Sequence, residues 1–105
     1  MRDYKIYAKM SKILETRKGY LKEKDNEEKS NFLSIFNYCV NSMKDEYLNI
    51  LNQTYLNPSY QFWWLDYYCK SSFYRKRFVA VYSFVSLFEM IYENFDSNSI
   101  NFINS

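Results

Sequence analysis

The sequence predicts an all-α protein: a compact bundle of about five helices, with a C-terminal helix-turn-helix and a long last helix. Three observations support this class. The chain of 105 residues has one Gly and one Pro, whereas the tight turns of all-β folds consume many of both. Apolar residues recur at helical spacing along most of it. A chain of this length forms one domain, which we place at residues 1–105.

The first half of the chain predicts two helices. Apolar side chains recur at helical spacing from Tyr4 to Leu21, and Gly19 is expected to weaken or end this first helix. Residues 22–30 are charged and lack apolar side chains, so they are expected to be a linker or the exposed first turn of the next helix. The pattern from Phe32 to Met43 predicts a strongly amphipathic second helix.

The second half predicts three more helices. Residues 45–55 form the third, and Pro58 suits the start of a short fourth helix that reaches Tyr68. After a polar break, the last helix is expected from about Ser72 to Asn94 or Phe95. Its predicted apolar face holds Phe73, Ala80, Phe84, Leu87, Phe88 and Ile91. The tail 96–105 is rich in Asn and Ser and is expected to fray.

Composition excludes most enzyme chemistry. The chain has no His, one Gly and two Cys, which removes His-dependent catalysis, His-ligated zinc and glycine-rich phosphate loops. Cys39 and Cys69 are far apart and lack neighbouring ligands, so they are expected to be free thiols. We therefore predict a protein that is not an enzyme and has no cofactor, no metal and no small-molecule substrate.

The location predicted from the sequence is the cytoplasm. The first residues show no secretory signal, and the most apolar stretch, residues 78–92, is too short and polar to span a membrane. Aromatic residues make up 22% of the chain, but the scarcity of Ala and the abundance of Asn, Lys and Ile indicate an A/T-rich codon bias. We attribute most aromatics to that bias and to the core.

Charge is unevenly distributed along the last helix. Residues 66–82 hold four basic side chains and one acidic, whereas residues 83–105 hold three acidic side chains and no basic one. This order opposes the helix dipole, which favours acids at the N-terminus and bases at the C-terminus. An anionic partner at the N-terminal end would account for it, because phosphate favours that end of a helix.

Residues 45–84 have the layout of a helix-turn-helix unit, in which the last helix enters the DNA major groove. Tyr67 to Arg77 (YYCKSSFYRKR), followed by Ala80 and Phe84, resembles the S-K-S-T-x-Y-R-x-x-x-x-A-x-x-x-L pattern of recognition helices in sigma-factor region 4 and related small bacterial helix-turn-helix regulators. The preceding aromatic stretch resembles a family of small uncharacterised mollicute proteins. The turn lacks the usual Gly, and a Trp pair replaces small aliphatic residues, so the interhelix angle is open.

The resemblance implies DNA binding or association with RNA polymerase. The resemblance carries over Ser71, Ser72, Tyr74, Arg75 and Lys76, and three of these, Ser72, Arg75 and Lys76, also lie on the polar face of the predicted helix. The candidate nucleic-acid contacts are Lys70, Ser71, Ser72, Tyr74, Arg75, Lys76 and Arg77. Arg77 falls on the apolar side of the helix, so its stem is expected to be buried while its head reaches a phosphate or water. Trp63 and Trp64 are interpreted as core residues or as anchors for a protein partner.

The predicted function is DNA binding in transcription, as a sigma-like or RNA-polymerase-associated factor, with a homodimer or polymerase supplying further affinity. The rival hypothesis is a non-catalytic helical module for protein interaction or oligomerisation. On that hypothesis, the last helix pairs with another protomer and nucleic acid has no part.

Overall fold

Four α-helices account for most of the chain in the computed structural model, which describes residues 2–104, and the side chains of residues 4–94. They are α1 (Arg2–Leu21), α2 (Glu27–Asn41), α3 (Asp45–Leu51) and α4 (Lys70–Asn104). Within the described range the chain is 81% helical and has no strand, which confirms the all-α class. The tail 96–105, predicted to fray, lies outside the residues whose side chains are described.

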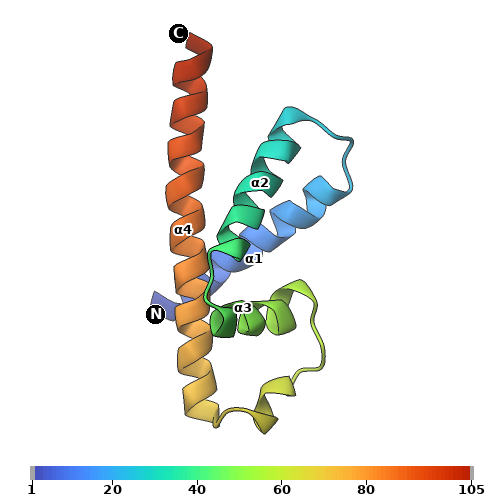
Figure 1. Ribbon diagram of the computed structural model, residues 1–105, viewed down its shortest axis with the longest axis vertical. Helices are drawn as coiled ribbons and strands as arrows, with labels where there is room; N and C mark the ends of the chain where they lie inside the picture. Colours follow the sequence, from blue (N-terminus) through green and yellow to red (C-terminus); the bar gives the residue numbers. More distant parts are fainter. Residues whose placement is uncertain (1, 105) are drawn as a thin grey trace.

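The helices α1 and α2 form a hairpin that leans against the middle of α4 (Figure 1). Gly19 does not end α1, which continues to Leu21. The turn then leads into α2 through Asn26, whose side chain accepts a hydrogen bond from the Lys29 backbone N–H at 2.8 Å. This bond satisfies one of the N–H groups that an α-helix leaves unpaired at its start.

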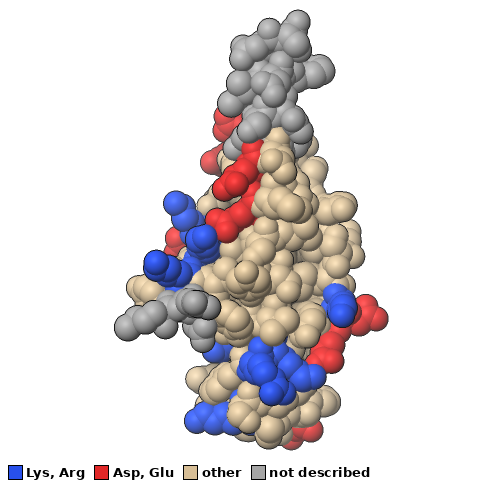
Figure 2. All heavy atoms as spheres, turned by 90° about the vertical axis from the view of Figure 1, so that its left-hand side faces the viewer, with Lys and Arg blue, Asp and Glu red and all other residues tan. Residues whose placement is uncertain are grey.

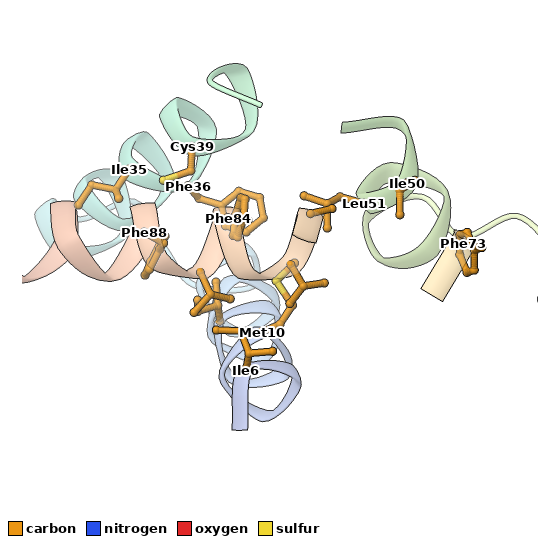
Figure 3. Packing of buried hydrophobic residues seen from close by; sticks show 14 of the residues in the cluster. Ile6, Met10, Ile35, Phe36, Cys39, Ile50, Leu51, Phe73, Phe84 and Phe88 are labelled. Atoms are coloured by element: carbon orange, nitrogen blue, oxygen red, sulfur yellow. The ribbon is translucent and has the colours of Figure 1, made fainter. Parts of the chain in front are cut away.

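A single apolar core joins the hairpin to α4. Phe36 and Cys39 of α2, Met10 of α1 and Phe84 of α4 are all at most 1% exposed, and Figure 3 shows side chains from α1, α2 and α4 entering the same core. The predicted apolar face of α4 faces the core: Phe73, Ala80, Phe84 and Phe88 are buried, and Leu87 and Ile91 are half-buried against it. Each large side chain fully buried in this way stabilises the fold by about 2 kcal/mol.

The helix α3 crosses α4 nearer to its N-terminus and ends in an irregular turn (Figure 1). Residues Asn52–Leu56 form a π-helical turn, η1, which the Asn57 backbone N–H closes by donating to the Asn52 carbonyl at 2.7 Å. A π turn widens the helix and is frequent at functional sites. Residues 57–62 continue without a helix.

The structure differs from the prediction between Pro58 and Tyr68. The expected fourth helix is one 3₁₀ turn, η2 (Trp63–Asp66), so the described chain has four α-helices instead of about five, and the second helix of the predicted helix-turn-helix is not found. Tyr, Phe and Trp are weak helix formers. Both neighbouring indoles also turn into the core, where they pack on the ring of Phe73.

Candidate nucleic-acid interface

The candidate interface is the N-terminal end of α4. This helix begins at Lys70, two residues before the predicted start, and the Cys69 carbonyl accepts from the Phe73 N–H at 2.9 Å. Ser71 and Ser72 therefore lie inside the first turn instead of capping it. No acidic residue stands in that turn, so the positive dipole end of the helix is not offset by a carboxylate of its own first turn and favours an anion.

The structure exposes four of the seven predicted contact residues and partly covers the other three. Lys70, Ser71, Tyr74 and Arg75 are exposed. Ser72, Lys76 and Arg77 are half-buried. The candidate surface is therefore narrower than the sequence predicts.

Arg75 is the exposed guanidinium of this end. It has no hydrogen bond or ion pair with the rest of the described chain. Lys70 is the first residue of the same helix, with its ammonium 6.0 Å from the ring centre of Tyr74. Both cations are consequently available to an external anion without breaking a contact between charged groups.

Lys76 is engaged within the fold. Its ammonium pairs with the Glu46 carboxylate of α3 and lies 5.6 Å from the ring centre of Tyr68. The hydrogen bond from Lys76 to Glu46 raises the lysine pKa, so the lysine remains protonated at neutral pH. Because Glu46 neutralises this charge, Lys76 contributes less to an electrostatic surface than the sequence suggests.

Arg77 lies among aromatic rings and not on the outer face. Its guanidinium carbon is 5.0 Å from the ring centre of Tyr74, 5.1 Å from that of Tyr7 and 5.9 Å from that of Phe73. The Arg77 Nε is buried and has no hydrogen-bond partner among the described atoms. The sequence predicted the buried stem, but not that the head would be held under rings contributed by α1 and α4.

Both tryptophans belong to the core. Trp63 and Trp64 are 5% and 6% exposed, so neither ring is accessible as an anchor for a protein partner. Trp64 stacks on Phe73 with ring centres 4.6 Å apart, and Trp63 meets the same ring edge-on at 5.6 Å. These contacts attach the irregular segment to the first turn of α4.

Sequence reasoning missed an exposed apolar surface on that segment, which we call the aromatic loop. Its members are Tyr60, Phe62, Leu65 and Tyr67, each about half exposed or more. They flank the two buried tryptophans in sequence. An aromatic-rich sequence gives no local signal that separates buried from exposed rings, because the partition depends on the fold of the loop.

The charge order predicted along α4 is visible on the surface. Figure 2 views the molecule from the side on which α4 lies in Figure 1. It shows basic side chains over the lower part of that side and acidic side chains higher along α4. Near the middle, Lys9 of α1 pairs with Glu89 of α4 at 3.2 Å. The surface lysines of α1 thus partly offset the acidic half of α4, while the N-terminal end keeps unpaired cations.

The two thiols are free and lie in opposite environments. Cys39 is fully buried, and burial raises its pKa to about 11. Cys69 is exposed, and hydrogen bonds from the Ser72 N–H and the Ser71 hydroxyl lower the pKa of its thiol. No group of three or more potential metal ligands occurs among the described residues.

No family model matches the chain, and neither curated proteins nor solved structures show significant similarity to it. None of the helices, over their described residues, has an apolar stretch long enough to cross a bilayer. The chemistry of the α4 end must therefore be argued from its own residues.

Proposed function

We propose that this protein binds duplex DNA through the N-terminal end of α4, in a role in transcription, as a sigma-like or RNA-polymerase-associated factor in the cytoplasm. The observation that carries the proposal is the unpaired, exposed Arg75 on a helix end that also carries the exposed Lys70 and has no acid in its first turn. Arginine is suited to phosphate and to guanine edges because its planar fork donates two parallel hydrogen bonds.

The remaining exposed groups of this end fit the same partner. Ser71 and Tyr74 carry hydroxyls beside the two cations, and such side chains hydrogen-bond to phosphates, sugars and bases. If the N-terminal end of α4 enters the DNA major groove, the aromatic loop would lie beside the sugar-phosphate backbone. The predicted second helix of the helix-turn-helix would have occupied that place. Arg77 faces inward, so it is left out of this surface.

The affinity expected from this surface is low. Two phosphates neutralised by Lys70 and Arg75 correspond to a slope of log K against log salt of about −2. A single module with that footprint would bind weakly alone. A second copy, or docking on RNA polymerase, would supply the rest of the affinity.

Fluorescence anisotropy with a labelled random duplex tests the proposal. We expect saturable binding at low salt, weakened several-fold at moderate salt. Arg75→Ala should lower the affinity several-fold and reduce the salt slope by about one unit. Lys22→Ala, which removes an exposed lysine from the turn after α1, is the matched control and should bind as the parent does.

Two results would overturn DNA binding at this end. One is the absence of binding at low salt, and the other is unchanged binding by the double variant Lys70→Ala/Arg75→Ala. Circular dichroism of each variant shows whether it retains its helices, so that loss of binding is not mistaken for unfolding.

The aromatic loop favours a second candidate function, protein interaction without nucleic acid. Phe62 and Leu65 are 48% and 58% exposed, and clustered exposed apolar side chains mark interaction surfaces. On this reading Phe62→Ser/Leu65→Ser abolishes self-association in sedimentation velocity, and DNA retention is absent throughout. A parent chain that sediments as a monomer at high concentration would remove the homodimer form of this candidate.

A further inference from the structure

A hollow of about 210 Å³ lies between η1, the aromatic loop and the start of α4. Its apolar wall contains Trp63, Trp64 and Phe73. Its polar wall contains Thr54 of η1 and Arg77 of α4, with neighbouring amide and hydroxyl side chains. The hollow is distinct from the proposed DNA-binding surface, because Arg75 and Lys70 do not line it.

Two under-satisfied polar groups meet at this hollow. Among the described side chains, the buried polar atoms that lack a hydrogen-bond partner are Thr54 Oγ1 and Arg77 Nε, and both residues line it. Native structures leave few such atoms, because an unsatisfied buried donor loses its hydrogen bonds to water without regaining them in the fold. Both atoms belong to residues that line one concave site, and a ligand-binding pocket is an apolar cavity with a few such polar groups in its wall.

Arg77 also lacks an anionic partner. No carboxylate of the described chain pairs with it, and its nearest electrostatic neighbours include the phenols of Tyr7 and Tyr55. Burial raises the pKa of Tyr55, and the Arg77 charge only opposes that rise. The Tyr55 phenol therefore supplies no negative charge at physiological pH, so no anionic side chain of the described chain offsets the Arg77 guanidinium at the edge of this apolar pocket.

We propose that this hollow binds a small carboxylate with a compact apolar body, with Arg77 holding the carboxylate and the rings of Trp63, Trp64 and Phe73 contacting the body. A guanidinium matches a carboxylate in planar, two-bond geometry, and the Thr54 hydroxyl supplies a further donor. The volume equals that of about seven liquid waters, which suits a molecule the size of benzoate.

The intrinsic tryptophan fluorescence of the protein reports on ligand binding at this site. The sequence contains two tryptophans, and both line the hollow. Titration with benzoate at constant ionic strength is expected to change the emission saturably, with a Kd on the order of 1 mM for so small a ligand. Acetate, inorganic phosphate and chloride are the comparison anions, and acetate and phosphate should bind at least several-fold more weakly because they lack the apolar body.

Variants test which residue supplies the charge. Arg77→Gln should weaken benzoate by about tenfold or more, as expected for a hydrogen bond to a charged group. Arg17→Gln is the matched control, since Arg17 also lies over an aromatic ring, that of Phe36 at 4.8 Å, but does not line the hollow. Thr54→Val preserves the side-chain shape and should weaken binding by a smaller factor.

Thermal melts provide a second measurement that does not depend on emission. Bound benzoate should raise the Tm of the parent and of Arg17→Gln, and leave that of Arg77→Gln unchanged. The proposal is overturned by an unsaturable response, by phosphate binding as tightly as benzoate, or by equal losses in Arg77→Gln and Arg17→Gln. Carboxylate binding at this hollow needs no DNA, so it can fail or succeed independently of the proposed function.

Discussion

The two halves of α4 are built differently. From Phe78 onward, α4 packs on α1 and α2 through regular apolar faces, and its buried positions follow the helical repeat. From Lys70 to Arg77, it packs on a π turn, a loop and a 3₁₀ turn, with cations held against rings. Among the described side chains, the buried polar atoms without a hydrogen-bond partner are Arg77 Nε in the irregular half and Thr54 Oγ1 in the π turn packed on it, and none lies in the regular half.

The largest expected effect concerns the regular half. Phe84 is 1% exposed and meets the ring of Phe36 edge-on, with centres 5.2 Å apart. Phe84→Ala should lower the free energy of unfolding by about 3–5 kcal/mol, because it removes apolar burial and leaves a cavity. Urea melts followed by circular dichroism measure this loss.

Tyr82→Ala is the control for that substitution. Tyr82 lies on the same helix but is 54% exposed, so the change should stay within about 0.5 kcal/mol. Equal losses at the two positions would show that the buried stripe of α4 does not carry the stability of this half.

The second prediction compares the two thiols, because Cys39 of α2 lies in the core beside the regular half of α4 and Cys69 directly precedes the irregular half. At neutral pH, iodoacetamide should modify Cys69 at least about a hundredfold faster than Cys39. The Cys69 thiol is exposed with a lowered pKa, whereas Cys39 reacts only when the core opens. Mass spectrometry of peptides after timed quenching gives both rates.

The pH dependence of alkylation sharpens this comparison. Only the thiolate reacts, so the Cys69 rate should rise with pH with a midpoint below the ordinary thiol value. Cys39 keeps its proton in the folded state more strongly than when unfolded, because its pKa is raised to about 11. Its contribution to stability is therefore present at neutral pH and is lost between about pH 9 and pH 11. Cys39→Ala should remove this pH-dependent part of the stability. Comparable labelling rates for Cys39 and Cys69 would contradict the burial of Cys39.

The same division between the halves decides what could be read from the sequence. The apolar stripes of α2 and α4 were predictable, because burial there repeats every three or four residues and needs only local spacing. The segment around Trp63 and Trp64 was not. Its aromatic residues are compatible with several backbone conformations. The observed one places Trp64 on the face of the Phe73 ring and Trp63 at its edge, and these contacts are not visible in the local sequence.

The candidate site was predictable only in part. The helix end, its exposed Arg75 and its charge order follow from residues close in the chain. The roles of Lys76 and Arg77 depend on distant partners, since Glu46 neutralises the one and the ring of Tyr7 covers the other. Such long-range pairs leave no local signature in one sequence.

A smaller effect is expected at Gly19 of α1, the helix that packs on the regular half of α4. It lies inside α1 with a negative φ, and a Cβ added there would meet no atom within 4 Å. Gly19→Ala should raise the free energy of unfolding by about 0.4–1 kcal/mol, because it restricts the unfolded chain and favours the helix. Gly19→Val should gain less, since a β-branched side chain loses rotamer freedom in a helix. A loss of stability in Gly19→Ala urea melts would show that this end of α1 is not helical.

The smallest effect separates the ion pairs of the two halves. Lys9 and Glu89 are both more than a third exposed, so their coupling in a double-mutant cycle with Gln substitutions should be about 0.2–1 kcal/mol and should fall with salt. The pair of Lys76 with Glu46 should couple more strongly, because its lysine is less exposed and also contacts the ring of Tyr68.

The Lys76 pair bears on the proposed function as well as on stability. If its coupling is the stronger, Lys76 stays with Glu46 when DNA binds, and Glu46→Gln should tighten DNA binding by releasing a third cation at the same helix end. If the two couplings are equal, Lys76 is already free to leave its partner. Glu46→Gln would then change the DNA affinity only through the loss of one negative charge, and the narrow surface of Lys70 and Arg75 would widen to include Lys76 without any substitution.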